Sequence, residues 1–362
     1  MSSSIRQSKR RKGVLPHEII FEILSRLPVR TLGRFKCVCK SWFDLIRDPF
    51  FVDVHMNRAK ENNDSLKYMV RLKGNRLYSN SSHPDDYRLQ AVNHPFKTSH
   101  NEIQVCNSCN GLLCLISNAE KETICLWNPA TGDYKVLPSS PTVDPPVWGR
   151  LHIEYGFGYC HSTNNYEVVK VVNYCDFDHY LVAYVYSLAN GLWRRIQGGP
   201  CITGDGTSGV LVNESLNWIE SHCSCNPRVV AFDIGGKEFR VVPQPGYGDC
   251  SFLEIGKLGG KLGLLRYDKW TGTYLEGWVM QDYGVGDSWT KLFIVNQGIY
   301  YFTALCDTMN NLINVSTDGR HVLSYDPKRG IMSYSECISF AGFSDARMYI
   351  ESLVGFNNLQ LQ

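Results

Sequence analysis

Residues 15–59 read LPHEIIFEILSRLPVRTLGRFKCVCKSWFDLIRDPFFVDVHMNRA, and this stretch decides how the N-terminal part of the chain folds. Its apolar residues recur with a helical period, and the first group on one face comprises Ile19, Ile20, Ile23, Leu24 and Leu27. Pro16 suits the first position of that helix, and Pro28 ends the run. Ser41 with Asp44 reads as a capping pair for a later helix, and Asp48 reads as the cap of the last one. The pattern predicts three or four short helices within residues 14–60.

The size of this helical segment raises a question about its apolar residues. A module of about 45 residues encloses little interior, yet this one carries more than a dozen large apolar side chains. Some of them must therefore be covered by something outside the module. The cover is either the larger remainder of this chain or another protein, and the residues alone leave both alternatives open.

Beyond residue 61 the helical period disappears, and short apolar or alternating runs follow, each bounded by Gly, Asn, Asp or Pro. A strand, turn and strand unit recurs in which an aromatic residue is followed seven positions later by another large side chain. The first aromatics of the five copies are Trp127, Tyr186, Phe232, Trp278 and Tyr325. A glycine lies five positions after the aromatic in three copies and four positions after it in the Phe232 copy. The Trp278 copy has a longer turn, which ends at Trp289.

The spacing of the copies indicates the architecture. Successive aromatics are 59, 46, 46 and 47 residues apart. A period of roughly 45 to 50 residues, four short strands long, is typical of a β-propeller blade. Residues 61–362 have room for about six blades and at most seven. A β-sandwich of unrelated hairpins is the alternative, and the even spacing favours the propeller. The expected fold class is therefore α+β multidomain, with a short all-α module followed by an all-β, propeller-like domain.

The helical segment resembles the F-box of plant F-box proteins. The matching positions are Leu15-Pro16, Leu27-Pro28-Val29, Arg34 to Lys40 with Trp42, and Asp48-Pro49 with Phe51. In that family the F-box binds a Skp-type adaptor. The adaptor-facing residues that the resemblance implies are Leu15, Pro16, Ile20, Ile23, Leu24, Leu27, Pro28, Leu32, Val38, Cys39 and Trp42. Leu24 and Trp42 are expected to matter most. For each residue the alternative is packing inside the F-box itself.

The β-rich part resembles the F-box-associated interaction domain of the same plant family, which is related to kelch repeats. The resemblance lies in residues 109–138, 155–172 and 185–196. It implies a substrate-recognition subunit of an SCF-type (Skp–cullin–F-box) ubiquitin ligase. The adaptor connects such a subunit indirectly to a cullin and a RING subunit, and the β domain binds a protein substrate that is ubiquitinated and degraded by the proteasome. A non-degradative F-box scaffold is the alternative.

The resemblance does not identify the substrate. We expect substrate contacts on loops at one face of the propeller, in residues 139–152, 197–207 and 244–251, because loops vary without disturbing the blades.

No motif for catalysis or cofactor binding is present, so we expect neither enzymatic activity nor a cofactor. The sequence lacks a nucleophile elbow, a phosphate loop and a pair of metal-binding histidines. Cys106 and Cys109, with Cys114, Cys223 and Cys225, offer the elements of a zinc site. Since no second properly spaced pair or histidine set accompanies them, we interpret them as core residues. A propeller hydrolase or oxidase with an axial metal remains an alternative that rests on fold analogy alone.

Charge and targeting signals indicate where the protein works. Residues 1–60 carry 13 Lys and Arg against 5 Asp and Glu, although the net charge of the chain is only +2. An acidic protein surface fits this basic segment better than nucleic acid does. The run Lys9, Arg10, Arg11 and Lys12 in the expected flexible tail, residues 1–13, has the composition of a nuclear import signal, and its alternative is a solvated tail.

The 14 cysteines are scattered, and no signal peptide or membrane-length apolar run is present. We therefore expect a protein of the cytoplasm, the nucleus or both, with no membrane partner.

Overall fold

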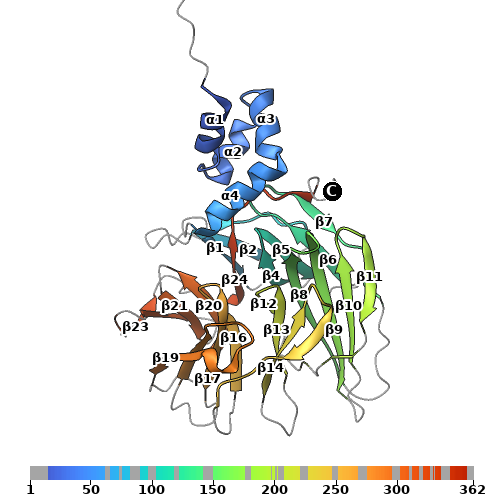
Figure 1. Ribbon diagram of the computed structural model, residues 1–362, viewed down its shortest axis with the longest axis vertical. Coiled ribbons are helices and arrows are strands. Elements are labelled where there is room, and N and C mark those ends of the chain that lie inside the picture. The colour runs from blue at the N-terminus through green and yellow to red at the C-terminus, as the bar shows by residue number, and fades with distance from the viewer. Residues whose placement is uncertain are drawn as a thin grey trace, which may run out of the picture.

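The computed structural model describes most of the chain. The described residues are 15–61, 66–72, 76–81, 90–96, 103–117, 122–141, 150–175, 181–196, 198–199, 202, 208–220, 227–246, 252–267, 275–295, 302–309, 312–317, 321–326, 329, 331–335 and 343–356. They form four α-helices followed by 24 strands, with a short 3-10 helix at Gly286–Ser288. The helices sit on one end of the β domain (Figure 1). None of the described helices is long and apolar enough to cross a membrane.

The helical module has the expected number of helices. They are α1 (His17–Leu24), α2 (Val29–Phe35), α3 (Lys40–Arg47) and α4 (Pro49–Glu61). The Asp48 carboxylate accepts a hydrogen bond from the Phe51 backbone N–H at 3.1 Å, which confirms Asp48 as the cap of the last helix. The expected Ser41 cap is wrong, because α3 begins at Lys40 and Cys39 occupies the cap position without a side-chain hydrogen bond. Leu27 lies beyond the end of α1, in a turn closed by its own N–H bonding to the Leu24 carbonyl at 3.0 Å.

The turn after α1 is fixed to α4 by a buried histidine. Nε2 of His55 lies 2.9 Å from the Leu27 carbonyl and must donate to it. Arg58, one turn later on α4, bonds the Ser25 hydroxyl and the Glu22 carboxylate of α1. Burial lowers the pKa of His55, the hydrogen bond to the Leu27 carbonyl opposes that change, and the positive charge of Arg58 adds to it. The folded module therefore favours the neutral imidazole.

The β domain is a propeller of six four-stranded antiparallel sheets in the described part of the chain. Five of these sheets are each formed by four consecutive strands. The first contains β4 (Ile103–Cys109), β5 (Leu112–Ser117), β6 (Thr123–Trp127) and β7 (Tyr134–Val136). The second contains β8 (Arg150–Cys160), β9 (Asn165–Cys175), β10 (Leu181–Ser187) and β11 (Leu192–Ile196). The third contains β12 (Val210–Val212), β13 (Ser215–Glu220), β14 (Arg228–Asp233) and β15 (Glu238–Val241). The fourth contains β16 (Phe252–Leu258), β17 (Lys261–Tyr267), β18 (Leu275–Met280) and β19 (Trp289–Val295). The fifth is β20 (Phe302–Met309), β21 (Leu312–Thr317), β22 (His321–Asp326) and β23 (Ile331–Ser335).

The sixth sheet joins the two ends of the propeller. It contains β1 (Leu66–Leu72), β2 (Arg76–Ser81) and β3 (Gln90–Ala91), and its innermost strand is the C-terminal β24 (Phe343–Ile350). β24 pairs with β1 from Leu66 opposite Ile350 to Leu72 opposite Phe343. The innermost strands β4, β8, β12, β16, β20 and β24 each contact the next one around the ring, and β20 contacts β24. The C-terminal strand therefore closes the propeller.

The repeat seen in the sequence is the hairpin between the third and fourth strands of a blade. Its two marked residues lie directly opposite each other, as in Trp127 with Tyr134, Tyr186 with Trp193, Phe232 with Phe239, and Tyr325 with Met332. Such opposed large side chains are the unit of cross-strand stabilisation. The fourth copy differs, because a register shift after Gly277 pairs Trp278 with Lys291 and Met280 with Trp289.

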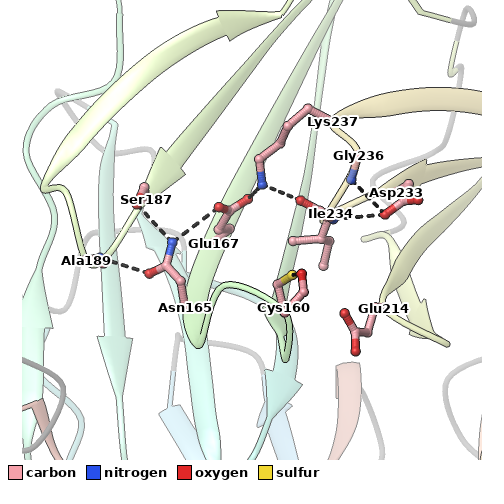
Figure 2. A network of polar contacts seen from close by, with 12 residues as sticks. Cys160, Asn165, Glu167, Ser187, Ala189, Glu214, Asp233, Ile234, Gly236 and Lys237 are labelled. Carbon is pink, nitrogen blue, oxygen red and sulfur yellow. Dashed lines mark hydrogen bonds and ion pairs between the residues drawn. The ribbon is translucent and has the colours of Figure 1, made fainter. Parts of the chain in front are cut away.

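In the Phe232 copy of the repeat the glycine lies four positions after the aromatic instead of five, and the structure explains why. The residue five positions after Phe232 is Lys237, and it adopts the left-handed conformation at φ +60° that glycine has at the equivalent turns. Its ammonium group bonds the Ile234 carbonyl in its own turn and reaches the neighbouring blade, where it bonds the buried Glu167 carboxylate (Figure 2). Asn165 donates to Glu167 at 3.2 Å and to the Ser187 hydroxyl at 2.9 Å. The lysine thus links two blades, which a glycine cannot do.

A second kind of link joins neighbouring blades at their outer strands. The indole N–H of Trp193 on β11 donates to the Pro138 carbonyl, just after β7, at 3.0 Å. The indole N–H of Trp289 on β19 donates to the Pro243 carbonyl, just after β15, at 2.8 Å. The same pairing therefore recurs in two places around the ring.

A close backbone approach fixes the turn between β4 and β5. Gly111 has φ +84°, and a Cβ built on it would lie 2.2 Å from the Ser352 hydroxyl and 2.7 Å from the Ile350 carbonyl oxygen.

We predict that Gly111→Ala destabilises the protein by about 3 kcal/mol or more, because conformational strain and steric overlap add. The matched control is Gly132→Ala, at φ +81° with nothing within 4 Å, which should cost only about 1 to 2 kcal/mol. Denaturant unfolding measures both; equal losses would contradict the close approach.

His55 makes the helical module sensitive to acid. Because the folded-state pKa lies below the ordinary value of 6.5, the unfolded chain binds the proton more readily. The stability that neutral His55 contributes is present above about pH 6.5 and is lost as the pH falls below it. Thermal melts at about pH 7.5 and about pH 5.5 should show a larger acid-induced fall in Tm for the native protein than for His55→Gln. An equal fall would mean that other groups set the pH dependence.

Candidate functional site

Six large apolar side chains of the helical module are exposed, with 38% to 68% of their surface accessible. They are Leu15, Ile19, Ile23, Val38, Phe43 and Phe50. Soluble proteins rarely leave such a cluster uncovered unless it binds a partner. The helical module is therefore the strongest candidate for a binding surface in the described part of the chain.

A buried set of apolar residues of the module shares one core with the propeller. Leu24, Leu32, Ile46, Phe51 and Met56 belong to one apolar cluster with residues of the first blades. The propeller members of that cluster include Cys109, Leu112, Leu126, Tyr166 and Leu188, together with Leu353 and Val354 after β24. Cover by the larger remainder of this chain is therefore confirmed for this set, and cover of the exposed set by another protein stays a prediction. The chain's own β domain buries one set, and another set is left for a second surface.

Helix α1 presents apolar side chains in two directions. Ile19 and Ile23 are four residues apart, so they lie one turn above each other on the exposed face. Leu24 is only 1% exposed and Ile20 is half-buried, and both pack towards the core. The helix therefore contributes to the core and to the exposed surface at once.

A second exposed group lies at the start of α3. Val38 and Cys39 are exposed, and Trp42 is half-buried with its ring centroid 5.3 Å from that of Phe35. The Arg47 guanidinium lies over the Phe43 ring at 5.1 Å. An aromatic residue that is held in place yet partly accessible is suited to anchor a partner.

An open hollow lies between α1 and α3. It is lined by His17, Phe21, Lys40, Ser41, Asp44, Leu45, Asp48 and Phe50. Phe21 is one of the lining residues, and its ring is stacked on Phe50 at 5.8 Å between ring centroids and edge-on to Phe51 at 5.3 Å. The lining therefore combines aromatic rings with both positive and negative side chains.

The charge along α2 and α3 is predominantly positive. Residues 29–47 carry five Lys and Arg, namely Arg30, Arg34, Lys36, Lys40 and Arg47, against a single Asp44. Burial lowers the pKa of Lys36, and the nearby Asp133 carboxylate of the propeller opposes that change. An apolar surface with a basic surround is complementary to a partner with an apolar patch and acidic side chains.

The structure separates the eleven expected adaptor-facing residues into three groups. Leu15, Pro16, Ile23, Pro28, Val38 and Cys39 are exposed; Ile20, Leu27 and Trp42 are half-buried; Leu24 and Leu32 are buried. Their contacts with an adaptor stay a prediction. Sequence reasoning did not single out Ile19, Phe43 and Phe50 as surface residues, and the four-residue spacing of Ile19 and Ile23 was the available signal for the first.

The cysteines that suggested a zinc site are core residues where the structure describes them. Cys106, Cys109 and Cys114 are buried in β4 and β5, and burial raises the pKa of Cys109 to about 11. Burial also raises the pKa of Cys125 to about 12, so these thiols resist ionisation. Within the described ranges, no group of His, Cys, Asp or Glu is placed to hold a metal ion. Cys223 and Cys225 lie outside the described residues.

Two other predictions fall largely outside the described part of the chain. Lys9, Arg10, Arg11 and Lys12 all lie outside it. Of the three expected substrate loops, the structure describes only residues 139–141, 150–152, 198–199, 202 and 244–246. Both stay predictions.

Comparison with known proteins agrees with the two-part organisation. Residues 13–56 match the family described as F-box-like, and residues 68–336 match the F-box associated beta propeller domain. The chain is 29% identical to the Arabidopsis thaliana F-box/kelch-repeat protein At3g23880, over 95% of this chain and 96% of that protein. It is 31% identical to the Arabidopsis thaliana F-box protein CPR1, over 79% of this chain and 74% of that protein.

Among solved structures, TolB from Acinetobacter baumannii superimposes with a TM-score of 0.50. The match has 12% identity and covers 78% of this chain and 66% of that one. At this identity the likeness concerns the propeller fold alone.

Proposed function

The chain belongs to the F-box proteins that carry an F-box-associated β-propeller domain, and on that premise we propose that it is a substrate-recognition subunit of a Skp–cullin–F-box ubiquitin ligase. In this role the helices bind a Skp-type adaptor and the propeller binds a protein that is to be ubiquitinated and degraded. In this proposal cullin-bound partner subunits carry out the transfer, and the chain acts as the receptor.

The observation that carries the proposal is the exposed apolar surface of the helical module. Leu15, Ile19, Ile23 and Val38 remain accessible although the propeller already buries the opposite side of the same module. Burying a large apolar side chain at an interface contributes about 1.5 to 3 kcal/mol, so this group suffices to anchor a partner. The surrounding Lys and Arg residues favour a partner with acidic side chains.

Strand direction supports a substrate site on the face opposite the helices. The turn after β4, at Asn110, bonds Ser352 beneath the helices, and the turn after β6, at Asn128, bonds the same residue. The fourth strand of each blade then runs away from that face. The connections from β7 to β8, β11 to β12 and β15 to β16 contain the three expected substrate loops, except that residues 150–152 belong to β8, and these connections therefore join strands at the distal face.

This arrangement accounts for activity without catalytic residues. A receptor that holds a target near activated ubiquitin raises the effective concentration of the target's lysines and leaves the chemistry unchanged. We place this function in the cytoplasm, the nucleus or both, with Lys9 to Lys12 as the import signal.

The adaptor surface is tested by charge substitutions at exposed positions. Ile23→Asp and Val38→Asp should each weaken binding of a purified Skp-type adaptor by about 30-fold or more, the equivalent of about 2 kcal/mol. The matched control is Ile294→Asp on β19, which is equally exposed but lies on the propeller. Leu24 is unsuitable for this test because a charge at a buried position would unfold the module.

Biolayer interferometry gives the affinities, and circular dichroism checks that each variant is folded. Native affinity in both helical variants, or an equal loss in the control, would contradict the proposed surface.

A further inference from the structure

The segment that follows the C-terminal strand lies between the helices and the propeller (Figure 1). Ser352, Leu353 and Val354 are at most 5% exposed. Leu353 and Val354 belong to the apolar cluster that contains both helical and propeller residues. We call residues Glu351–Val354 the C-terminal strap. Its position shows that the end of the chain forms part of the surface against which the helical module packs.

On the propeller side, one buried asparagine holds the strap. Asn128 is fully buried, and its side-chain amide donates to the Ser352 carbonyl at 3.0 Å and to the Val354 carbonyl at 2.7 Å. Its side-chain oxygen accepts from the Ala130 N–H at 2.9 Å. The Ser352 hydroxyl donates to the Asn110 carbonyl at 2.8 Å. Because these bonds are buried, breaking one leaves polar groups unsatisfied.

On the helical side, the strap carries a charge that faces two elements. The Glu351 carboxylate lies 2.8 Å from the Lys67 ammonium group at the start of β1 and 3.9 Å from the Arg30 guanidinium group of α2. The Glu351 side chain is only 13% exposed, so solvent screens the Lys67 pair less than a surface pair. The strap therefore touches α2, β1 and the β4–β7 blade within four residues.

We infer that the C-terminal strap couples the orientation of the helical module to closure of the propeller ring. β24 closes the ring by pairing with β1, and the next four residues support the helices. Loosening β24 or the strap then loosens the helices, although they are more than 280 residues away in sequence. The consequence for ubiquitin transfer, a fixed distance between adaptor and substrate, rests on the proposed function; the coupling itself does not.

The competing arrangement is one in which α4 alone positions the module. α4 buries Phe51, Val52 and Met56 in the shared cluster and continues towards β1. If those contacts sufficed, disturbing the strap would leave the exchange of backbone amides in the helices unchanged. Hydrogen exchange on the full chain distinguishes the two arrangements, because it reports local opening segment by segment.

The test compares two buried asparagines. Asn128→Ala removes the bonds to the strap, whereas Asn217→Ala removes an equally buried amide that donates to the Val210 and Ser215 carbonyls in the β12–β15 blade and accepts from the Tyr283 hydroxyl of the next blade. We expect Asn128→Ala to raise amide exchange about tenfold or more in residues 343–356 and in α2 and α4. We expect Asn217→Ala to raise exchange in its own blade and around Tyr283, and to leave α2 and α4 unchanged. Circular dichroism confirms that each variant retains the native fold.

A second variant covers the case in which Asn128→Ala does not fold. Glu351→Gln removes the charge that faces Lys67 and Arg30 but keeps the shape, and it should raise exchange in α2 more than in β4–β7. The inference is overturned if residues 343–356 loosen while α2 and α4 exchange at the native rate, or if Asn217→Ala loosens the helices as much as the strap variants do. No adaptor is present in this experiment, so its failure is distinct from failure of the proposed adaptor site.

Discussion

Pairing of the C-terminal strand β24 with β1 is the interaction on which the rest of the structure depends. A propeller blade buries its faces only against its neighbours, so an open ring would expose two blades at the gap. The chain avoids this by completing the blade that begins with β1 with its own last strand. The residues that follow then fill the space beneath the helices, which makes ring closure and module placement parts of one apolar core.

The helical module is divided between structural and binding roles at the level of single residues. Leu24 and Ile23 are neighbours in sequence, yet one is buried against the chain's own core and the other is half exposed. A small module can serve both purposes because successive residues on a helix point about 100° apart. The buried set holds the exposed set in a fixed position, and a fixed surface loses less conformational entropy on binding.

Much of the fold could be predicted from the sequence. The helical period and the turn prolines indicated the helices, and the spacing of Trp127, Tyr186, Phe232, Trp278 and Tyr325 indicated the propeller. Those aromatics carry information because they form direct cross-strand pairs within a local hairpin. β24 has no such signal, because its partner β1 lies more than 270 residues away and its register is set only once the ring has closed. The sequence also could not show that Leu24 and Leu32 are buried in the core while other expected adaptor-facing residues are exposed. The reason is that an apolar stripe on a helix does not reveal which neighbour it packs against.

Assembly with the ligase partners tests the central claim most directly. The purified full chain, a Skp-type adaptor and a cullin with its RING subunit would be mixed and analysed by size-exclusion chromatography with light scattering. The account predicts one peak whose mass corresponds to one copy of each component. Elution of the chain without the adaptor, or with the adaptor but without the cullin, would contradict its assignment as a ligase receptor.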